Sequence, residues 1–197
     1  ANFGQRDEGL RYGRVCTYCD TWQPVRAKHC HDCGKCVLKF DHHCHWVGTC
    51  VGLRNHGRFY AYLTVQTALA GWALALNQST YRDSGGGLED WFVLNLPAIV
   101  STVVLFGCCA FLACLWGFHT YLALTNQTTW EVSKGHAITY LQGVPENVFP
   151  FYRGMKVNAH EFCTGQLARP YVVPSDLELE VRTNTETIWD NRYYSCC

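Results

Sequence analysis

Cysteine and histidine are concentrated in one short stretch of this 197-residue chain, from Cys16 to Cys50. Seven of the 13 cysteines fall in this stretch together with five histidines, and these cysteines are Cys16, Cys19, Cys30, Cys33, Cys36, Cys44 and Cys50. They include three Cys-x-x-Cys steps, two of which overlap at Cys33, and this is the spacing at which two thiolates bind one zinc ion in a tight turn. The stretch therefore predicts a metal-binding domain rather than a disulfide framework.

Two zinc sites fit this stretch better than one. Neighbouring residues in an irregular loop point in different directions, so His42 and His43 are poor candidates for the same ion. Two closed tetrahedral sites need eight ligands. Six cysteines and two histidines would fill them and leave one cysteine over, and Cys44 is the best candidate because Asp41 and His42 lie beside it.

Cys44 has two interpretations at this point. A thiol near an imidazole that a carboxylate holds is the usual arrangement for lowering the pKa of a cysteine and making it a nucleophile. On that interpretation Asp41, His42 and Cys44 form a catalytic group. The alternative is that Cys44 is another zinc ligand, and the spacing alone favours neither interpretation.

The motifs in this stretch match a known family. They are Cys16-x-x-Cys19, Pro24, Arg26, His29-Cys30-x-x-Cys33-x-x-Cys36-Val37, Asp41-His42-His43-Cys44, Trp46, Cys50-Val51-Gly52, Asn55 and Phe59. Two motifs follow downstream, Thr128-Thr129-Trp130-Glu131 and the segment 151–163, which contains Asn158. In this order, with hydrophobic segments between them, they resemble the DHHC family of protein S-acyltransferases (palmitoyltransferases) over nearly the whole chain up to about Cys163.

The resemblance implies roles for individual residues. It implies a first structural zinc held by Cys16, Cys19, His29 and Cys36, and a second held by Cys30, Cys33, His43 and Cys50. It implies Cys44 as the acyl-accepting nucleophile, His42 as its general base and Asp41 as the group that orients His42. Supporting residues would be Thr128, Thr129, Glu131 and Asn158. Two positions depart from the family: His45 stands where it usually has Pro, and Thr49 where it usually has Asn.

The apolar residues form two blocks. Residues 59–76 are almost entirely apolar or small, and a second block has an uninterrupted centre from Ala98 to Phe118. About twenty such residues in a helix cross a bilayer core. Between the blocks Arg82 is the single basic residue against three acidic ones, whereas basic residues flank the outer ends, so both ends are expected in the cytosol.

We therefore expect a mainly α-helical, multi-span membrane protein with a loop-rich, cysteine-rich cytosolic domain of short β-hairpins around two zinc sites. The expected segments are an N-terminal cytosolic segment (1–15), the zinc domain (16–58), a transmembrane helix (59–77), a luminal or extracellular loop (78–92), a second transmembrane helix (93–124), a cytosolic region with the last two motifs (125–165) and a cytosolic tail (166–197). In the tail, the alternation over 177–181 fits either a strand or a disordered segment, and Cys196 and Cys197 are candidates for lipid attachment.

The function that the resemblance implies is transfer of a palmitoyl group from palmitoyl-CoA to protein cysteines near a membrane, by a ping-pong mechanism through acyl-Cys44. The bilayer would be a partner, in the Golgi, another endomembrane (ER or vacuole) or the plasma membrane. Residues 1–58 carry nine basic against five acidic residues, which fits attraction to the phosphates of coenzyme A and to an anionic cytoplasmic leaflet. The alternative, which is favoured for any single residue, is an ordinary positively charged cytosolic flank of a membrane span. No nucleic acid is expected as a partner, because no basic recognition helix follows the cysteines.

Two alternatives remain. A zinc-dependent protein-binding module of the RING or LIM kind explains the ligands but not the apolar blocks. A truncated, weakly active or inactive membrane adaptor explains both and differs only in what Cys44 does. Family members generally have two further spans before the cysteine-rich domain, whereas this sequence begins fifteen residues before Cys16, so an incomplete acyl-binding cavity is also expected.

Overall fold

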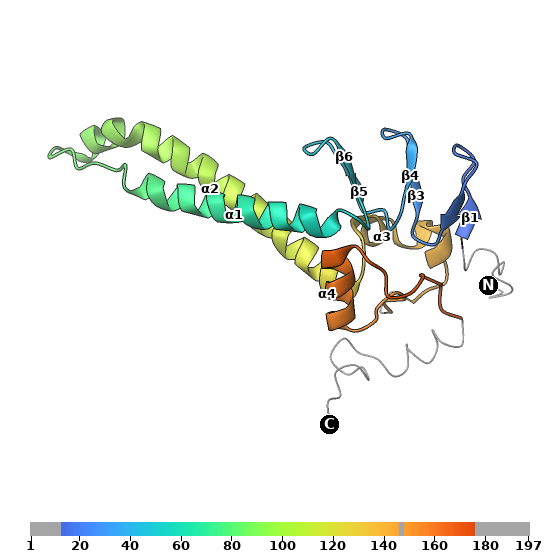
Figure 1. The fold of residues 1–197 in the computed structure, drawn as a ribbon. Coiled ribbons are helices and arrows are strands. Elements are labelled where there is room, and N and C mark those ends of the chain that lie inside the picture. The colour runs from blue at the N-terminus through green and yellow to red at the C-terminus, as the bar shows by residue number, and fades with distance from the viewer. Residues whose placement is uncertain (1–12, 146–147, 176–197) are drawn as a thin grey trace, which may run out of the picture. The chain divides into compact units, whose positions relative to one another are not determined.

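The computed structural model describes residues 13–145 and 148–175 (Figure 1). These residues divide into two compact units, one formed by the described residues up to Gly57 and from Tyr121 onward, the other by Arg58–Thr120. The first unit holds the hairpins and the short helices, and the second holds most of two long helices. Residues 1–12 and the tail features at 177–181, Cys196 and Cys197 lie outside the described residues.

Three separate antiparallel hairpins make up the cysteine-rich region, in blue to cyan in Figure 1. They pair β1 (Gly13–Val15) with β2 (Trp22–Pro24), β3 (Lys28–Cys30) with β4 (Lys35–Val37), and β5 (His42–Cys44) with β6 (Thr49–Val51). Every strand has only three residues, and an isolated two-stranded hairpin is marginally stable at best in water. The hairpins therefore need cross-links from outside their own backbone hydrogen bonds.

Two long helices follow the hairpins. Helix α1 (His56–Gln78) has 23 residues and α2 (Leu88–Thr125) has 38, and both are long and apolar enough to cross a membrane by length and composition. Only 6% of the apolar window of each helix is buried, unlike the core helix of a soluble protein. Both extend beyond the apolar stretches because the polar flanking residues continue the helical hydrogen bonding, so the helix ends differ from the expected 59–77 and 93–124.

Polar contacts join α1 and α2 along their length. Tyr60 and Thr120 hydroxyls lie 2.8 Å apart near one end, and Asn77 donates to the Thr102 hydroxyl at 2.7 Å near the other. This pairing of early with late residues makes the two helices antiparallel. Side-chain hydrogen bonds of this kind contribute to helix association in an apolar environment, at about 0.6 kcal/mol each on average.

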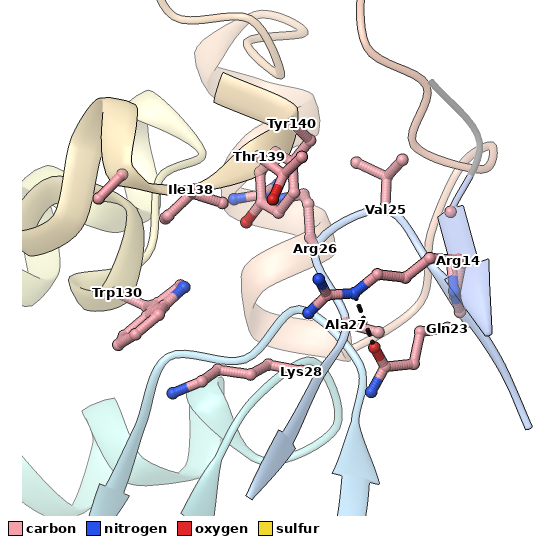
Figure 2. Close-up of a pocket in the computed structure, with 13 residues that line it drawn as sticks. Arg14, Gln23, Val25, Arg26, Ala27, Lys28, Trp130, Ile138, Thr139 and Tyr140 are labelled. Atoms are coloured by element: carbon pink, nitrogen blue, oxygen red, sulfur yellow. Dashed lines mark hydrogen bonds between the residues drawn. The ribbon is translucent and has the colours of Figure 1, made fainter. Parts of the chain in front are cut away.

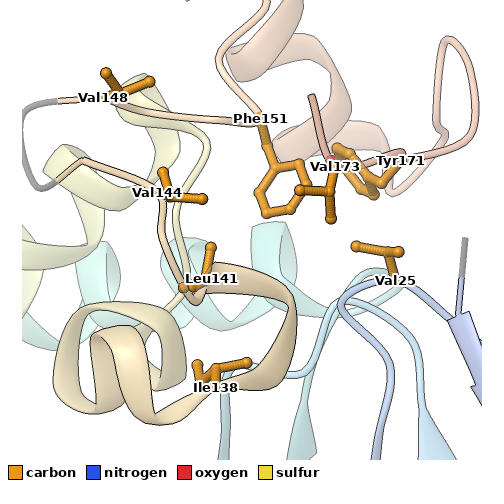
Figure 3. Close-up of a cluster of buried hydrophobic side chains, with 8 residues drawn as sticks. All are labelled: Val25, Ile138, Leu141, Val144, Val148, Phe151, Tyr171 and Val173. Atoms are coloured by element: carbon orange, nitrogen blue, oxygen red, sulfur yellow. The ribbon is translucent and has the colours of Figure 1, made fainter. Parts of the chain in front are cut away.

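The hydrophobic core of the first unit lies between the hairpins and the C-terminal segments (Figure 3). Its buried members are Val25, Ile138, Leu141, Val144, Val148, Phe151, Tyr171 and Val173. They come from the turn after β2, from 3₁₀ helices η2 (Gly135–Ala137) and η3 (Thr139–Leu141) and their flanks, and from residues on both sides of α4 (Met155–Thr164). Burying one such side chain contributes about 1.5–3 kcal/mol, so this core fixes the C-terminal segments against the first hairpin.

Candidate active site and metal sites

The first group of metal-ligating side chains contains Cys16, Cys19, His29 and Cys36. Their ligand atoms all lie within 4.8 Å of one another. Sγ of Cys19 lies 3.2 Å from Nδ1 of His29, and Sγ of Cys36 lies 4.0 Å from the same nitrogen. A tetrahedral zinc with ordinary bond lengths separates such S and N ligands by about 3.6 Å. These four side chains therefore fit a Cys₃His zinc site.

Register explains why His29 and Cys36 meet. The two residues are directly opposite each other in the β3–β4 ladder, although seven positions separate them in the chain. Gln23 of β2 donates a hydrogen bond of 3.1 Å to Sγ of Cys36, and such a contact to a metal-ligating atom helps to fix its orientation. The group therefore joins the first hairpin to the second.

The second group contains Cys30, Cys33, His43 and Cys50. Nδ1 of His43 lies 3.3 Å from Sγ of Cys33 and 3.6 Å from the sulfurs of Cys30 and Cys50. His43 and Cys50 are opposite each other in the β5–β6 ladder. Burial, followed by the neighbouring sulfurs of Cys30 and Cys33, raises the pKa of Cys50 above its usual range, so the group needs a cation to remain as thiolates. A second Cys₃His zinc site fits here.

Neither group includes Cys44, which is 6% exposed at the end of β5. Side chains alternate between the two faces of a strand, so His42 and Cys44 point to one face of β5 while His43 points to the other. This alternation separates the histidine of the metal group from the histidine beside the thiol. The spacing of the residues alone does not show which face of the strand each histidine occupies.

Asp41 holds His42 beside Cys44. Nδ1 of His42 lies 2.6 Å from Oδ2 of Asp41, and the Asp41 side chain is completely buried. Burial favours the neutral form of His42, but the hydrogen bond and charge of Asp41, and then those of Cys44, outweigh it and raise the pKa of the imidazole. The arrangement gives a base whose Nδ1 is occupied, which leaves Nε2 to receive a proton.

Asp41 is itself fixed by helix α3 (Thr129–Lys134) and the start of α1. The backbone N–H of Thr129 donates to Oδ1 of Asp41 at 2.7 Å, and the Thr129 hydroxyl donates to Oδ2 at 2.8 Å. Nε2 of His56 lies 3.7 Å from Oδ1. Charge-assisted hydrogen bonds are about twice as strong as neutral ones, so these contacts fix the carboxylate in one orientation.

A capping box places Thr129. The Thr128 hydroxyl accepts from the backbone N–H of Glu131, and the Glu131 carboxylate accepts from the N–H of Thr128 at 3.0 Å. These reciprocal bonds satisfy two backbone donors at the start of α3. Thr128 therefore acts on Asp41 through the helix start, and Thr129 contacts it directly.

Arg26 connects this helix to the hairpins. Its guanidinium donates to both carboxylate oxygens of Glu131 at 2.7 Å, and to the side-chain and backbone oxygens of Asn126 at 2.9 and 2.8 Å. The rings of Phe151 and Tyr171 each lie 4.4 Å from its central carbon. Burial alone would lower the pKa of Arg26, but Glu131 outweighs it and raises this pKa above its ordinary value. Arg26 also has φ of +70°, a strained backbone conformation that these contacts offset.

Helix α4 extends the same network. Asn158 donates to the Leu124 carbonyl at 2.7 Å, which ties α4 to the end of α2. Glu161 accepts from Arg153 at 2.6 Å and from the Tyr171 hydroxyl at 2.9 Å. The Tyr171 hydroxyl also lies 3.2 Å from the Asn126 oxygen that Arg26 contacts. The last two sequence motifs thus meet in one buried polar network.

Residues 11–136 match the family model described as DHHC palmitoyltransferase. The chain belongs to this family. It is 35% identical over 194 residues to "Putative ZDHHC-type palmitoyltransferase 7" of Dictyostelium discoideum, covering 95% of this chain and 44% of that protein. It is 39% identical over 183 residues to "Protein S-acyltransferase 10" of Arabidopsis thaliana, covering 93% and 52% respectively.

A human relative gives a similar result. "Palmitoyltransferase ZDHHC12" of Homo sapiens is 38% identical over 161 residues, with 76% of this chain and 55% of that protein covered. The chain thus spans about half the length of the curated relatives it matches. DHHC proteins are membrane proteins, and the two apolar helices of this chain agree with that class.

Sequence reasoning on this DHHC protein missed several residues of the site. In the sequence Arg26 appears only as part of a motif, and no pattern assigns a role to His56, Asn126 or Glu161. Each is at most 2% exposed although it is polar or charged. No short spacing connects them, since Arg26 and Glu131 are 105 positions apart, so the only signal in the sequence is the presence of polar residues near recognised motifs.

Proposed function

We propose that this chain is the catalytic part of a protein S-acyltransferase in which Cys44 accepts a fatty acyl group from acyl-CoA and passes it to a protein cysteine. One observation carries the proposal: Cys44 lies outside both metal groups and beside His42. Nδ1 of this histidine lies 2.6 Å from Oδ2 of buried Asp41. The relatives described above are named as palmitoyltransferases and an S-acyltransferase. The adaptor alternative has less support because His42 lies 2.6 Å from Asp41 and interacts with Cys44, as a catalytic role would require.

The mechanism has two balanced steps. Nε2 of His42 takes the proton of the Cys44 thiol, and the thiolate attacks the thioester carbon of acyl-CoA. A new thioester forms on Cys44 as the bond to coenzyme A breaks, and the leaving thiolate takes the proton from His42. In the second step His42 takes the proton of a substrate cysteine, whose thiolate attacks acyl-Cys44. The product thioester forms as the bond to Cys44 breaks, and His42 returns the proton to the Cys44 thiolate.

Zinc would serve this mechanism structurally. A closed four-ligand site has no open position for substrate, so it supplies folding energy rather than Lewis-acid chemistry. The first group would join the β1–β2 hairpin to β3–β4, and the second would join β3–β4 to β5–β6. Because each hairpin is too short to be stable alone, the two ions would hold β5, and with it His42 and Cys44, in position.

A basic pocket suits the phosphates of coenzyme A. Its volume is about 220 Å³, and Figure 2 shows Arg14, Lys28 and Trp130 among the residues that line it. Nζ of Lys28 lies 3.5 Å from the centre of the Trp130 ring, and Nζ of Lys134 lies 5.7 Å from the same centre. Burial, the largest effect, lowers the pKa of Lys28, and a phosphate beside the amine would raise this pKa again.

We also propose that α1 and α2 span a membrane with both outer ends in the cytosol. Arg54 and Arg58 precede or begin the first span and Lys134 follows the second, whereas the connection carries Arg82 against three acidic residues. This distribution follows the positive-inside rule. Protein substrates would then present cysteines close to the cytosolic membrane surface of an endomembrane or the plasma membrane.

The test is acyl-adduct formation by zinc-loaded chain in nanodiscs with labelled palmitoyl-CoA. We expect a hydroxylamine-sensitive adduct on the unmodified chain and none on Cys44→Ala, with two zinc ions per chain in both. Cys163→Ala is the matched control, because this exposed thiol belongs to neither metal group, and it should retain the adduct. An adduct that survives in Cys44→Ala, or its absence from a well-folded unmodified chain, would contradict the proposal.

A further inference from the structure

A second cavity lies among residues that the proposed catalysis does not use. Its volume is about 590 Å³, within the range of small-molecule sites. Exposed apolar side chains border it, including Trp22, Leu38, Leu167 and Val172. Buried Val25 and Tyr171, both drawn in Figure 3, also line it. It contains none of the proposed metal ligands or catalytic residues.

Lys39 is the unusual member of this lining. It is 4% exposed, and no hydrogen bond or ion pair joins its ammonium group to any residue in the described part of the chain. Its Nζ lies 5.7 Å from the ring centre of Tyr171, which lines the same cavity. The other two cations at this core differ, because Arg26 pairs with Glu131 and Arg153 pairs with Glu161. An ammonium without a partner on a side chain this deeply buried is costly, and a bound anion would reduce that cost.

The charges around Lys39 leave it available to an anion. Arg169 is a second cation of the lining, and no acidic side chain lines the cavity within the described residues. Three carboxylates on neighbouring elements of the described chain raise the pKa of Lys39 through their charge, but none forms an ion pair with it. Each accepts hydrogen bonds or ion pairs from other residues: Glu131 from Arg26, Glu161 from Arg153 and Tyr171, and Asp41 from Thr129 and His42.

Lys39 can also change its charge near neutral pH. Burial, followed by the charge of Arg26, lowers the pKa of Lys39 to about 7, against the opposing effect of Glu131, Glu161 and Asp41. A negative charge placed beside the amine would raise this pKa again. Binding of an anion and protonation of the amine therefore favour each other.

We propose that this cavity is a binding site for a small apolar monocarboxylate, whose carboxylate pairs with Lys39 and whose hydrocarbon body packs against the apolar lining. One buried ammonium matches one negative charge, whereas a phosphate dianion would need further buried donors. The lining is mainly apolar, and Lys39 is its one buried charged group whereas Arg169 is exposed, which is typical of sites for amphipathic small molecules. The site is independent of acyl transfer at Cys44, so a failure of either proposal leaves the other standing.

The test measures protection of individual lysines in the zinc-loaded full chain. Acetylation with a limiting acylating reagent at pH 8 is quantified for each lysine by peptide mass spectrometry, with and without saturating 4-phenylbutyrate. We expect the carboxylate to slow acetylation of Lys39 about tenfold, because an opposite charge at 4–6 Å favours the protonated amine. Lys35, on the exposed part of β4, is the internal control and should not change. Protection should also need less ligand at pH 6.5 than at pH 8.

The uncharged analogue 4-phenylbutanol tests the role of the charge, and phenylalkyl phosphate tests the choice of head group. Unchanged labelling of Lys39, equal protection by the alcohol, or stronger protection by the phosphate would each overturn the proposal. Saturation-transfer NMR gives a second readout on the ligand itself. Its signal should be lost in Lys39→Met and kept in Lys35→Met, with two zinc ions in each variant. If Lys39→Met does not fold, the labelling result on the unmodified chain decides.

Discussion

Glu131→Gln removes one charge of the buried pair with Arg26 and keeps the size of the side chain. The side chains of Arg26 and Glu131 are 0% and 4% exposed. Oε1 of Glu131 accepts from Arg26 and the Tyr140 hydroxyl, and Oε2 accepts from Arg26 and the Thr128 backbone. In glutamine one of these oxygens becomes an NH₂ group, so one N–H of Arg26 faces another donor in either orientation of the amide.

The expected cost follows from that geometry. Breaking one side of a buried, hydrogen-bonded ion pair costs about 3–5 kcal/mol, because the remaining charge stays buried without compensation. For a chain of this size about 1 kcal/mol moves the unfolding midpoint by roughly 2–4 °C. We therefore expect Glu131→Gln to lower the midpoint of the unit that contains Trp130 by about 6–20 °C.

Thermal unfolding in detergent, followed by tryptophan fluorescence and by zinc release, measures this effect. Each transition is analysed separately, since the chain has two compact units and need not unfold in one step. The control is Glu89→Gln, which removes an exposed carboxylate and should shift the midpoint by less than about 2 °C. The double variant Arg26→Met with Glu131→Leu should recover part of the loss, because an apolar pair leaves no unpaired charge.

A shift below about 2 °C for Glu131→Gln would refute this reasoning, since a pair this buried has no solvent to compensate for the lost charge. A double variant no more stable than the single one would also refute it. Either result would mean that α3 is held by its apolar contacts rather than by Arg26.

Four further predictions use other contacts. Gly57→Ala places a Cβ about 2.7 Å from the Phe162 carbonyl, so we expect about 1–3 kcal/mol of destabilisation by thermal unfolding. Thr129→Val removes the hydroxyl that donates to Asp41, and adduct formation should slow about tenfold, with recovery in Thr129→Ser. Burial opposes ionisation of Glu161, but its hydrogen-bond donors outweigh burial and lower its pKa. The difference in free energy of unfolding between the unmodified chain and Glu161→Gln should therefore be constant above pH 5 and vanish as the pH falls below 4.5. Removing zinc with a chelator should abolish hydrogen-exchange protection of the three hairpins and leave the centres of α1 and α2 protected.

The sequence predicted the local structure where a pattern repeats over few residues. The Cys-x-x-Cys steps predicted metal-binding turns, and the apolar blocks predicted two long helices. Helix α1 begins at His56 and α2 at Leu88, in polar segments whose hydrogen bonding a hydropathy pattern does not report, and the membrane spans at 59–77 and 93–124 stay predictions. The short β-hairpins of the cysteine-rich region were expected and are present.

The candidate site needed three-dimensional information in two places. The separation of His42 from His43 depends on strand β5, whose alternation turns one towards Asp41 and the other towards the second metal group. The Arg26 network depends on a contact between residues 105 positions apart. The unpaired state of Lys39 likewise follows only from the packing around it, because a lysine beside a DHHC motif carries no pattern of its own.

The central claim is that Cys44 carries the acyl group while the other cysteines of its domain hold zinc. Native mass spectrometry of the chain after incubation with palmitoyl-CoA tests it most directly, followed by peptide mapping of the modified cysteine. The account predicts one acyl group on Cys44 with two zinc ions retained, and two zinc ions also in Cys44→Ser without any acyl group. Loss of a zinc ion in Cys44→Ser, or an acyl group mapped to another cysteine, would contradict it.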